Sequence, residues 1–321
     1  MLIDLHSHLE GRVRPATAAE IAAELGVPEP EGGWARAIQL DGPADLTVYL
    51  QKVAATYPLF RSLAAVERIA REAVQDAAAA GLDYLELRFG PATHADTDGG
   101  LGQVINAMTA GLRAGSADTG MPSGAVIAAL RSHSTEVNEA VARAAVAQAG
   151  SGVVGFDLAG DELLFPDLAA HVPAFGIARA GGLGITCHAA EAAPASAARD
   201  AVELLGASRI GHGAHVADDP EVMRWCADEG IVLEICPTSN WYTGAIAEVA
   251  AHPAPRLRDS GVLVVLGDDN PVQTGSDLRA ERRILIDSLG WTDADLALLD
   301  AVSIDAAFLE PAQRLALRAR L

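Results

Sequence analysis

Short runs of β-branched and leucine residues alternate with longer alanine-rich stretches from one end of the chain to the other. The strand candidates are 2–5, 84–89, 124–130, 153–158, 184–188, 209–211, 232–236 and 262–266. Helical stretches between them include 64–80, 135–149, 195–205, 220–229 and 278–289. Eight strands in alternation with helices predict an α/β fold with a parallel sheet, and eight is the number that closes a (β/α)8 TIM barrel. The alternative is an open doubly wound sheet, which usually carries a glycine-rich phosphate loop after its first strand, and this sequence has none there.

The first connection, from Gly11 to Asp83, is too long for one crossover helix. We expect helices near 16–25, 44–56 and 63–80, so that inserted cap helices occupy about 12–80 and cover one end of the barrel. Residues 292–321 are expected to form C-terminal helices packed outside the barrel. Because no Pro-, Gly- or Ser-rich linker is long enough to separate domains, we expect a single domain over 1–321.

Composition narrows the range of partners. The 321 residues include 23 Lys plus Arg against 43 Asp plus Glu, a formal net charge of −20. An acidic surface repels nucleic-acid phosphates and anionic lipid, so neither nucleic acid nor a membrane is an expected partner. The cysteines Cys187, Cys226 and Cys236 are widely spaced, which indicates no disulfide framework and fits a reducing compartment. Since no run of ~18 apolar residues occurs, and Asp4 and His6 interrupt any signal-peptide core, we expect a cytoplasmic protein.

Histidines gather where the predicted strands end. His6 and His8 close the first strand, and side chains two residues apart on a strand point the same way, so both imidazoles can bind one ion. His188 follows the fifth strand, and Asp268-Asp269 follows the eighth. Three histidines and one aspartate form a site that suits zinc and leaves room for a water, whose pKa the ion would lower. We therefore expect one zinc ion per subunit.

Two further polar residues fit acid–base chemistry at the same end of the barrel. Glu191 lies three residues after His188, far enough along the loop to reach a substrate, and is a candidate general acid. His212 lies between glycines after the sixth strand and could orient the attacking hydroxide or shuttle its proton.

Other polar residues are given structural interpretations. Asp161 and Glu162 are expected to cap the next helix, and Arg88 to pair with a carboxylate inside the barrel. No pattern assigns a role to the histidines His94, His171 and His252.

Seven segments in order resemble the adenosine deaminase branch of the amidohydrolase superfamily. They are 6–11 (HSHLEG), 84–89 (YLELRF), 155–162 (GFDLAGDE), 188–191 (HAAE), 209–213 (RIGHG), 236–240 (CPTSN) and 267–271 (GDDNP). The resemblance covers nearly the whole predicted barrel, and it implies a (β/α)8 fold with a single zinc. The reaction that it implies is hydrolytic release of ammonia from C6 of an aminopurine.

The resemblance also implies roles for individual residues. His6, His8 and His188 would bind zinc. Glu191 would give a proton to purine N1, and His212 would aid the hydroxide. Gly160 would donate its backbone N–H to N3.

The last segment departs from the family pattern, in which two aspartates directly precede the proline. Counting back from Pro271 puts Asp269 at the metal-ligand position and Asn270 where the family's second aspartate contacts N7. In the alternative alignment Asp268 binds the metal and Asn270 is inserted. We prefer Asp269, and an Asn amide can donate to N7 without needing a raised pKa.

Glu10, Arg12 and Arg14, which follow the histidine pair, bear on the identity of the substrate. Adenosine-specific members commonly carry Asp where this chain has Glu10, and several adenine-specific members carry Glu. The stretch 243–245 looks more like the nucleoside enzymes, so we expect a nucleoside. Arg12 and Arg14 could bind an anionic group, which would favour a carboxylate-bearing adenosine derivative such as 6-amino-6-deoxyfutalosine, or they could be solvated loop residues.

The sequence therefore predicts a zinc-dependent deaminase that converts a 6-aminopurine nucleoside to the 6-oxopurine. Deamination of free adenine, or of another ring such as a pterin, is the alternative on the same barrel. A barrel that binds ligand without catalysis is a third hypothesis, which the intact set of polar residues disfavours. The sequence does not predict the oligomeric state.

Overall fold

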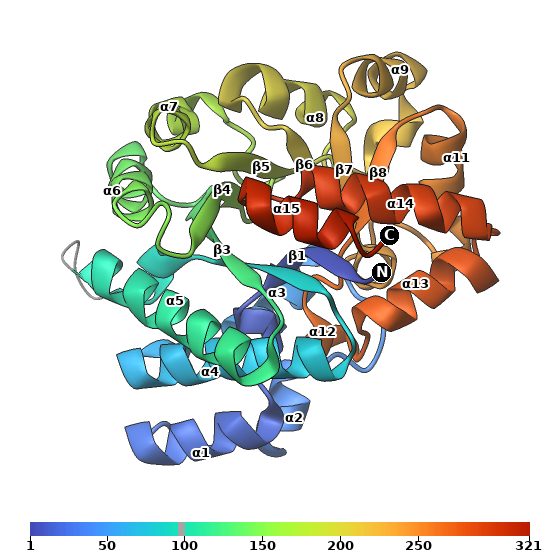
Figure 1. Cartoon of the computed structure of the whole chain (residues 1–321). Coiled ribbons are helices and arrows are strands. Elements are labelled where there is room, and N and C mark those ends of the chain that lie inside the picture. Colours follow the sequence, from blue (N-terminus) through green and yellow to red (C-terminus); the bar gives the residue numbers. More distant parts are fainter. Residues whose placement is uncertain (96–99) are drawn as a thin grey trace.

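The computed structural model describes residues 1–95 and 100–321. Its sheet contains eight parallel strands in the order in which they occur along the chain (Figure 1). They are β1 (Ile3–His8), β2 (Tyr84–Phe89), β3 (Ser123–Leu130), β4 (Val153–Ala159), β5 (Gly184–Ala189), β6 (Arg209–His212), β7 (Val232–Ile235) and β8 (Leu263–Leu266). The predicted (β/α)8 barrel is confirmed, and every predicted strand overlaps an observed one.

The first and last strands meet through the backbone just beyond β8. The amide of His8 donates to the carbonyl of Asp269 at 2.8 Å, and the amide of Asp269 donates to the carbonyl of His6 at 2.8 Å. These two bonds bring the end of β1 against the segment that follows β8. Two residues predicted to bind one metal therefore lie side by side because the barrel closes there.

Helices surround the sheet (Figure 1). Those before β4 are α1 (Pro15–Leu25), α2 (Gly33–Ile38), α3 (Leu46–Ala54), α4 (Leu63–Ala79), α5 (Gly100–Thr119) and α6 (Thr135–Val146). Those after β4 are α7 (Val172–Ala180), α8 (Ser196–Asp200), α9 (Pro220–Asp228), α10 (Pro237–Tyr242), α11 (Ala254–Asp259), α12 (Pro271–Thr274), α13 (Leu278–Asp287), α14 (Asp293–Ala306) and α15 (Pro311–Arg318). Within the described part of the chain, no helix is both long and apolar enough to span a membrane.

Two of the helices between β1 and β2, α3 and α4, lie in different places. α3 covers the carboxyl end of the barrel and lines a cavity there. α4 instead packs along α5 on the outside of the barrel, so closely that a Cβ at Gly111 would lie 2.2 Å from the carbonyl oxygen of Glu67. Of the expected cap helices, α3 is thus the one that faces the cavity.

The C-terminal helices close the opposite, amino end of the barrel. In Figure 1 they lie in front of the strands, beside both chain termini. One buried apolar cluster joins strand residues to this segment: Ile3, Leu5, Tyr84, Val232, Val265, Ile304, Ala307, Leu309 and Leu317. The amino end is therefore plugged by side chains, and the carboxyl end is left for a ligand.

Candidate active site

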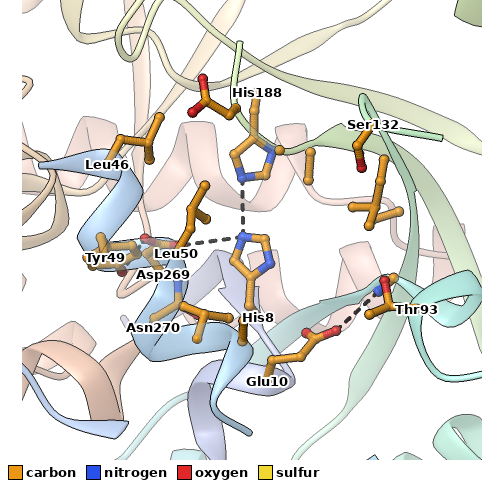
Figure 2. Close-up of a pocket in the computed structure, with 18 of the residues that line it drawn as sticks. His8, Glu10, Leu46, Tyr49, Leu50, Thr93, Ser132, His188, Asp269 and Asn270 are labelled. Atoms are coloured by element: carbon orange, nitrogen blue, oxygen red, sulfur yellow. Dashed lines mark hydrogen bonds and ion pairs between the residues drawn. The ribbon is translucent and has the colours of Figure 1, made fainter. Parts of the chain in front are cut away.

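A cavity of about 300 Å³ opens at the carboxyl ends of the strands, a size at the lower end of small-molecule sites. Its lining combines an apolar face of α3 with polar residues from the strand ends. The α3 residues are Leu46, Tyr49, Leu50, Val53 and Ala54, and the polar strand-end residues include His8, Glu10, His188, Glu191, His212, Asp269 and Asn270. Figure 2 shows His8 between His188 and Asp269.

The predicted metal ligands converge at the floor of this cavity. Nε2 of His8 lies 3.2 Å from Nε2 of His188 and 3.3 Å from Oδ1 of Asp269. Nε2 of His6 lies 3.6 Å from the same carboxylate oxygen. The donor atoms of His6, His8 and Asp269 all lie within 4.8 Å of one another, and so do those of His6, His188 and His212. Groups from β1, β5, β6 and the segment after β8 thus face one point.

The chemistry of this donor set fits a borderline divalent cation such as zinc. Nε2 of His6 is buried and has no hydrogen-bond partner among the described residues, as a nitrogen that binds a metal would have none. Burial lowers the pKa of His8 well below its ordinary range, so the ring is neutral and has a lone pair to donate. Burial alone would raise the pKa of Asp269, but the adjacent ring of His6 and the other neighbouring imidazoles hold this pKa well below its ordinary range.

Of the two aspartates after β8, only Asp269 faces the histidines. The Asp268 carboxylate turns the other way and accepts from Nη2 of Arg12 at 2.6 Å. The same nitrogen donates to Asp4 at 3.1 Å, and Nε of Arg12 donates to Ser7 at 2.8 Å. This geometry supports Asp269, rather than Asp268, as the metal ligand.

Because of these contacts, the Arg12 side chain does not face the cavity. Its guanidinium is buried between carboxylates and does not line the cavity, contrary to the substrate contact expected for it. Arg14 pairs with Asp76 on α4 at 2.6 Å. Neither arginine is placed to bind an anionic group of a substrate, because each already neutralises carboxylates of the protein itself.

Two of the candidate histidine ligands are oriented by buried carboxylates that sequence patterns did not identify in this role. Nδ1 of His6 lies 2.8 Å from Glu234 on β7, and Nδ1 of His188 lies 3.0 Å from Asp157 on β4. A carboxylate at Nδ1 fixes the ring so that Nε2 faces the metal. Such partners are set by contacts across the barrel, so spacing along the chain does not reveal them.

Asp269 is held in a comparable way. Its Oδ2 accepts hydrogen bonds from the hydroxyls of Tyr49 at 2.7 Å and Ser239 at 2.6 Å, while Oδ1 faces the histidines. One carboxylate oxygen is therefore saturated by hydroxyl donors, and the other is free for a metal. Nothing in the sequence pattern of α3 marked Tyr49 for this contact.

Unusual backbone conformations are concentrated at this site. Within 1–95 and 100–321, the non-glycine residues with positive φ are Ala190 (53°), His212 (61°) and Asp269 (57°). A non-glycine residue in the left-handed region costs of order 1–3 kcal/mol and persists where its surroundings enforce it. Two of the three are candidate site residues, and the third directly precedes Glu191.

Glu191 lies in a loop that Glu162 holds in place. The Glu162 carboxylate accepts from the amides of Ala190 at 3.0 Å, Ala192 at 2.5 Å and Ala193 at 2.8 Å. Asp161 was expected to cap the next helix, but a turn follows it, and its Oδ1 accepts from the amides of Leu163 and Leu164 in that turn. Glu162 instead clamps the loop on either side of Glu191.

The environment of Glu191 keeps its carboxyl group protonated. Burial raises the pKa of Glu191 well above its ordinary range, and the negative charges of Asp269 and Glu162 raise it further. Oε2 of Glu191 lies 3.7 Å from Nε2 of His212. A buried carboxylic acid next to the histidine cluster is suited to donate a proton to a bound ring.

The remaining predicted contacts also lie on the cavity wall. Gly160, at the end of β4, has a φ of 109°, a conformation that favours glycine, and it is exposed in the cavity. Asn270 is buried, and its Oδ1 has no partner among the described residues. Oε1 of Glu10 lies 3.0 Å from Nε2 of His94, a ring that stacks against both Phe60 and Phe89.

Comparison with known proteins identifies the family. A family model described as adenosine deaminase matches residues 2–321. The chain is 36% identical over 323 residues to an adenosine deaminase of Shewanella loihica, covering 99% of this chain and 97% of that protein. It is 34% identical over 325 residues to an adenosine deaminase of Erwinia tasmaniensis, covering 100% and 97%.

Solved structures with the same fold include several deaminases. An adenine deaminase from Arthrobacter aurescens superposes with a TM-score of 0.90 at 25% identity, covering 98% of this chain and 96% of that one. The N6-mAMP deaminase of Arabidopsis gives a TM-score of 0.88 at 26% identity, covering 99% and 96%. An amidohydrolase from Burkholderia ambifaria with bound zinc gives 0.91 at 25% identity, covering 99% and 88%. The chain therefore belongs to the adenosine deaminase family and is a hydrolase that acts on C–N bonds.

Proposed function

We propose that this protein is a zinc-dependent deaminase of an uncharged 6-aminopurine nucleoside, which it converts to the 6-oxopurine and ammonia. The observation that carries the proposal is one cavity in which a histidine–aspartate cluster faces Glu191, a buried carboxyl group whose pKa is raised by burial. The substrate class deduced from the family is an aminopurine. The lining of the cavity selects among aminopurines.

Each side chain has a task that its environment supports. His6, His8, His188 and Asp269 would hold zinc, which supplies a water that loses a proton near neutral pH. Glu191 gives its proton to ring N1, which makes C6 more electrophilic. His212 lies beside Glu191, where it orients the attacking oxygen or exchanges a proton with it.

Two residues position the purine. The backbone amide of Gly160 donates to N3 from the end of β4. The side-chain amide of Asn270 donates a hydrogen bond to N7, and it can do so at any pH because an amide does not titrate. Both residues line the cavity, where these backbone and side-chain N–H groups can face a bound ring.

The charge of the lining favours a neutral substrate. No Lys or Arg is among the lining residues that the structure describes, whereas Glu10 and Asp161 are. A phosphate or carboxylate on the substrate would meet these acids without a compensating cation, at an energetic cost. This disfavours nucleotides, the class of the Arabidopsis neighbour's substrate, and carboxylate-bearing nucleosides such as 6-amino-6-deoxyfutalosine.

Although several adenine-specific members carry Glu at the position of Glu10, the contacts of this residue suit a nucleoside. His94 occupies one carboxylate oxygen of Glu10, which leaves the other to accept a hydrogen bond from a ribose hydroxyl in the cavity. Free adenine remains the second candidate, because a structural neighbour is an adenine deaminase and Glu10 is the residue on which the two classes differ.

A parallel deamination screen tests the proposal. Zinc-loaded protein is given adenosine, adenine, AMP, 6-amino-6-deoxyfutalosine and a pterin, and released ammonia and ring absorbance are followed. We expect kcat/KM for adenosine to exceed that for the other substrates by at least about 100-fold. Preference for adenine would establish the free-base alternative, and preference for an anionic substrate would contradict the charge argument. No turnover of any aminopurine at full zinc occupancy would overturn the proposal.

A further inference from the structure

A chain of three buried hydrogen bonds leads from a backbone amide to His212. The amide N–H of Ala254 donates to Nδ1 of His252 at 3.1 Å. Nε2 of His252 lies 3.2 Å from Oδ1 of Asn240, and Nδ2 of Asn240 lies 3.1 Å from Nδ1 of His212. The three side chains are 3%, 0% and 2% exposed in that order, so no solvent competes for these bonds.

The direction of every bond in this chain follows from its first member. A backbone N–H can only donate, so Nδ1 of His252 must accept and carries no proton. Burial lowers the pKa of His252 to about 3, so the ring is neutral and its single proton is on Nε2. That N–H requires an acceptor, which places the oxygen of the Asn240 amide toward His252.

The nitrogen of Asn240 consequently faces His212. It donates to Nδ1 of His212, which therefore carries no proton, and the neutral ring has its proton on Nε2. The tautomer of His212 is thus determined from a backbone amide that lies 42 positions further along the sequence.

We propose that Asn240 and His252 are positioning residues that fix His212 as the Nε2–H tautomer, which keeps His212 out of the metal coordination sphere and makes it a hydrogen-bond donor to the attacking oxygen. The inference rests on the proposed function, since it chooses between the two roles open to His212 there. Donor atoms of His212, His6 and His188 lie within 4.8 Å of one another, so a free Nε2 lone pair would compete for the metal. A proton on Nε2 removes that competition.

The wild-type tautomer is directly measurable. Zinc-loaded protein labelled with 15N-histidine is examined by NMR, which separates the two ring nitrogens of a neutral imidazole by whether each carries a proton. The signals of His212 are identified by their loss in His212→Gln. We expect a protonated Nε2 and a bare Nδ1 in both His212 and His252. A proton on Nδ1 of His212 would overturn the inference.

His252→Phe breaks the chain while keeping a ring of similar size. Asn240 then loses the donor that orients it, so we expect a mixture of His212 tautomers and a fall in kcat of about 10- to 100-fold, with little change in KM. His252→Gln should restore both, because its amide can accept from Ala254 and donate to Asn240. His171→Phe is the matched control: His171 is also buried against an asparagine, Asn138, but does not line the cavity. It should leave the His212 signals and kcat unchanged.

Asn240→Asp gives an independent test if His252→Phe does not fold. A carboxylate can only accept, so Nδ1 of His212 should take the proton and leave Nε2 bare. We expect the NMR pattern of His212 to invert, kcat to fall, and zinc to be retained against a chelator at least as well as in the wild type. Wild-type tautomers in both Asn240→Asp and His252→Phe would contradict the proposal.

The NMR and turnover experiments together distinguish failure of this inference from failure of the proposed function. If the wild-type protein deaminates adenosine but His212 carries its proton on Nδ1, only the inference fails. If no aminopurine is turned over, the proposed function fails whatever the NMR spectrum shows.

Discussion

Single residues decide the chemistry of the cavity, and Glu191 is the clearest case. Its carboxyl group is buried beside other acids, so it is held in the protonated form that a general acid needs. Glu191→Gln keeps the shape and hydrogen-bonding capacity but has no proton to transfer. We expect kcat/KM to fall by at least about 100-fold with zinc content unchanged.

The control for this substitution is Glu203→Gln, which changes an exposed glutamate outside the cavity in the same way. Steady-state kinetics and metal analysis on both variants provide the comparison. An unchanged rate in Glu191→Gln would remove Glu191 from proton transfer to N1.

The sequence was enough to predict which polar residues line the cavity, but not which partners each of them contacts. His6, His8, His188, Glu191 and Asp269 were predicted to meet because carboxyl ends of barrel strands converge, and they lie together. Tyr49 was missed because its contact depends on how an inserted helix docks, which no strand pattern encodes. Arg12 was assigned to the substrate because its place in the sequence does not show that Asp4 and Asp268 enclose it.

At the scale of elements, α3 is connected to the candidate metal site through one hydroxyl. Tyr49 is 2% exposed and donates to Oδ2 of Asp269. Tyr49→Phe removes that donor and leaves Ser239 alone to hold the carboxylate. Because partners that orient a metal ligand typically contribute 10- to 100-fold to affinity, we expect zinc affinity to fall by about that factor.

Competition with a chelator measures the zinc affinity. Tyr242→Phe is the matched control, since Tyr242 ends α10 and does not line the cavity. Equal zinc affinity in Tyr49→Phe and the wild type would show that the α3 contact contributes only to packing.

A second link between elements joins α13 to the start of α10. The Glu281 carboxylate accepts from the amide of Thr238 at 3.0 Å and from the hydroxyl of Ser276. Burial raises the pKa of Glu281 to about 7, although the hydrogen bonds from Ser276 and Thr238 oppose this. A group whose pKa is higher in the folded state binds more protons when folded, so stability falls as pH rises from 4.5, the ordinary value, to about 7.

Glu281→Gln removes this titration. The free energy of unfolding of the variant relative to the wild type should therefore rise between pH 4.5 and pH 8, by up to about 3 kcal/mol. Urea unfolding at several pH values measures the difference. A difference that does not change with pH would mean that Glu281 titrates alike in the folded and unfolded chain.

The positions of the strands could be predicted from the sequence because the strands are buried on both faces. Most of the eight strands are short runs rich in apolar residues, because a parallel strand is covered on both faces. Ends were less certain: β1 runs to His8, beyond the predicted 2–5, because metal-ligand residues are polar while their backbone still pairs. The stretch 195–205 was expected as one helix, but α8 passes into a π-helical turn at Ala201–Leu205.

At the scale of the whole molecule, one ion network inside the barrel connects the active site to the C-terminal segment. Glu234 on β7 contacts His6, Arg88 and Arg209 at 2.6–2.8 Å. Arg209 also donates to Glu86 on β2 at 2.5 Å and to the carbonyl of Ala306 at 2.9 Å. The carboxylate that orients a metal ligand is therefore held by an arginine that also anchors the end of α14.

Arg209→Met tests how much of the molecule depends on this network. Methionine fills a similar volume, but Glu86 and Glu234 lose a buried cation, and breaking a buried ion pair on one side typically costs about 3–5 kcal/mol. We expect a loss of that size in the free energy of unfolding, measured in urea. Zinc affinity should fall as well, because Glu234 loses one of the cations that fix it against His6.

Arg71→Met provides the contrast, since Arg71 is half-exposed and pairs with Asp118 on the surface. Removal of this exposed pair is expected to destabilise the protein far less than Arg209→Met and to leave zinc affinity unchanged. If Arg209→Met is no more destabilising than Arg71→Met, the buried network contributes little to the fold. If it is destabilising but zinc affinity is unchanged, Arg209 supports the barrel without positioning His6, and the contacts of Glu234 with Arg88 and Thr186 are then enough to hold it against His6.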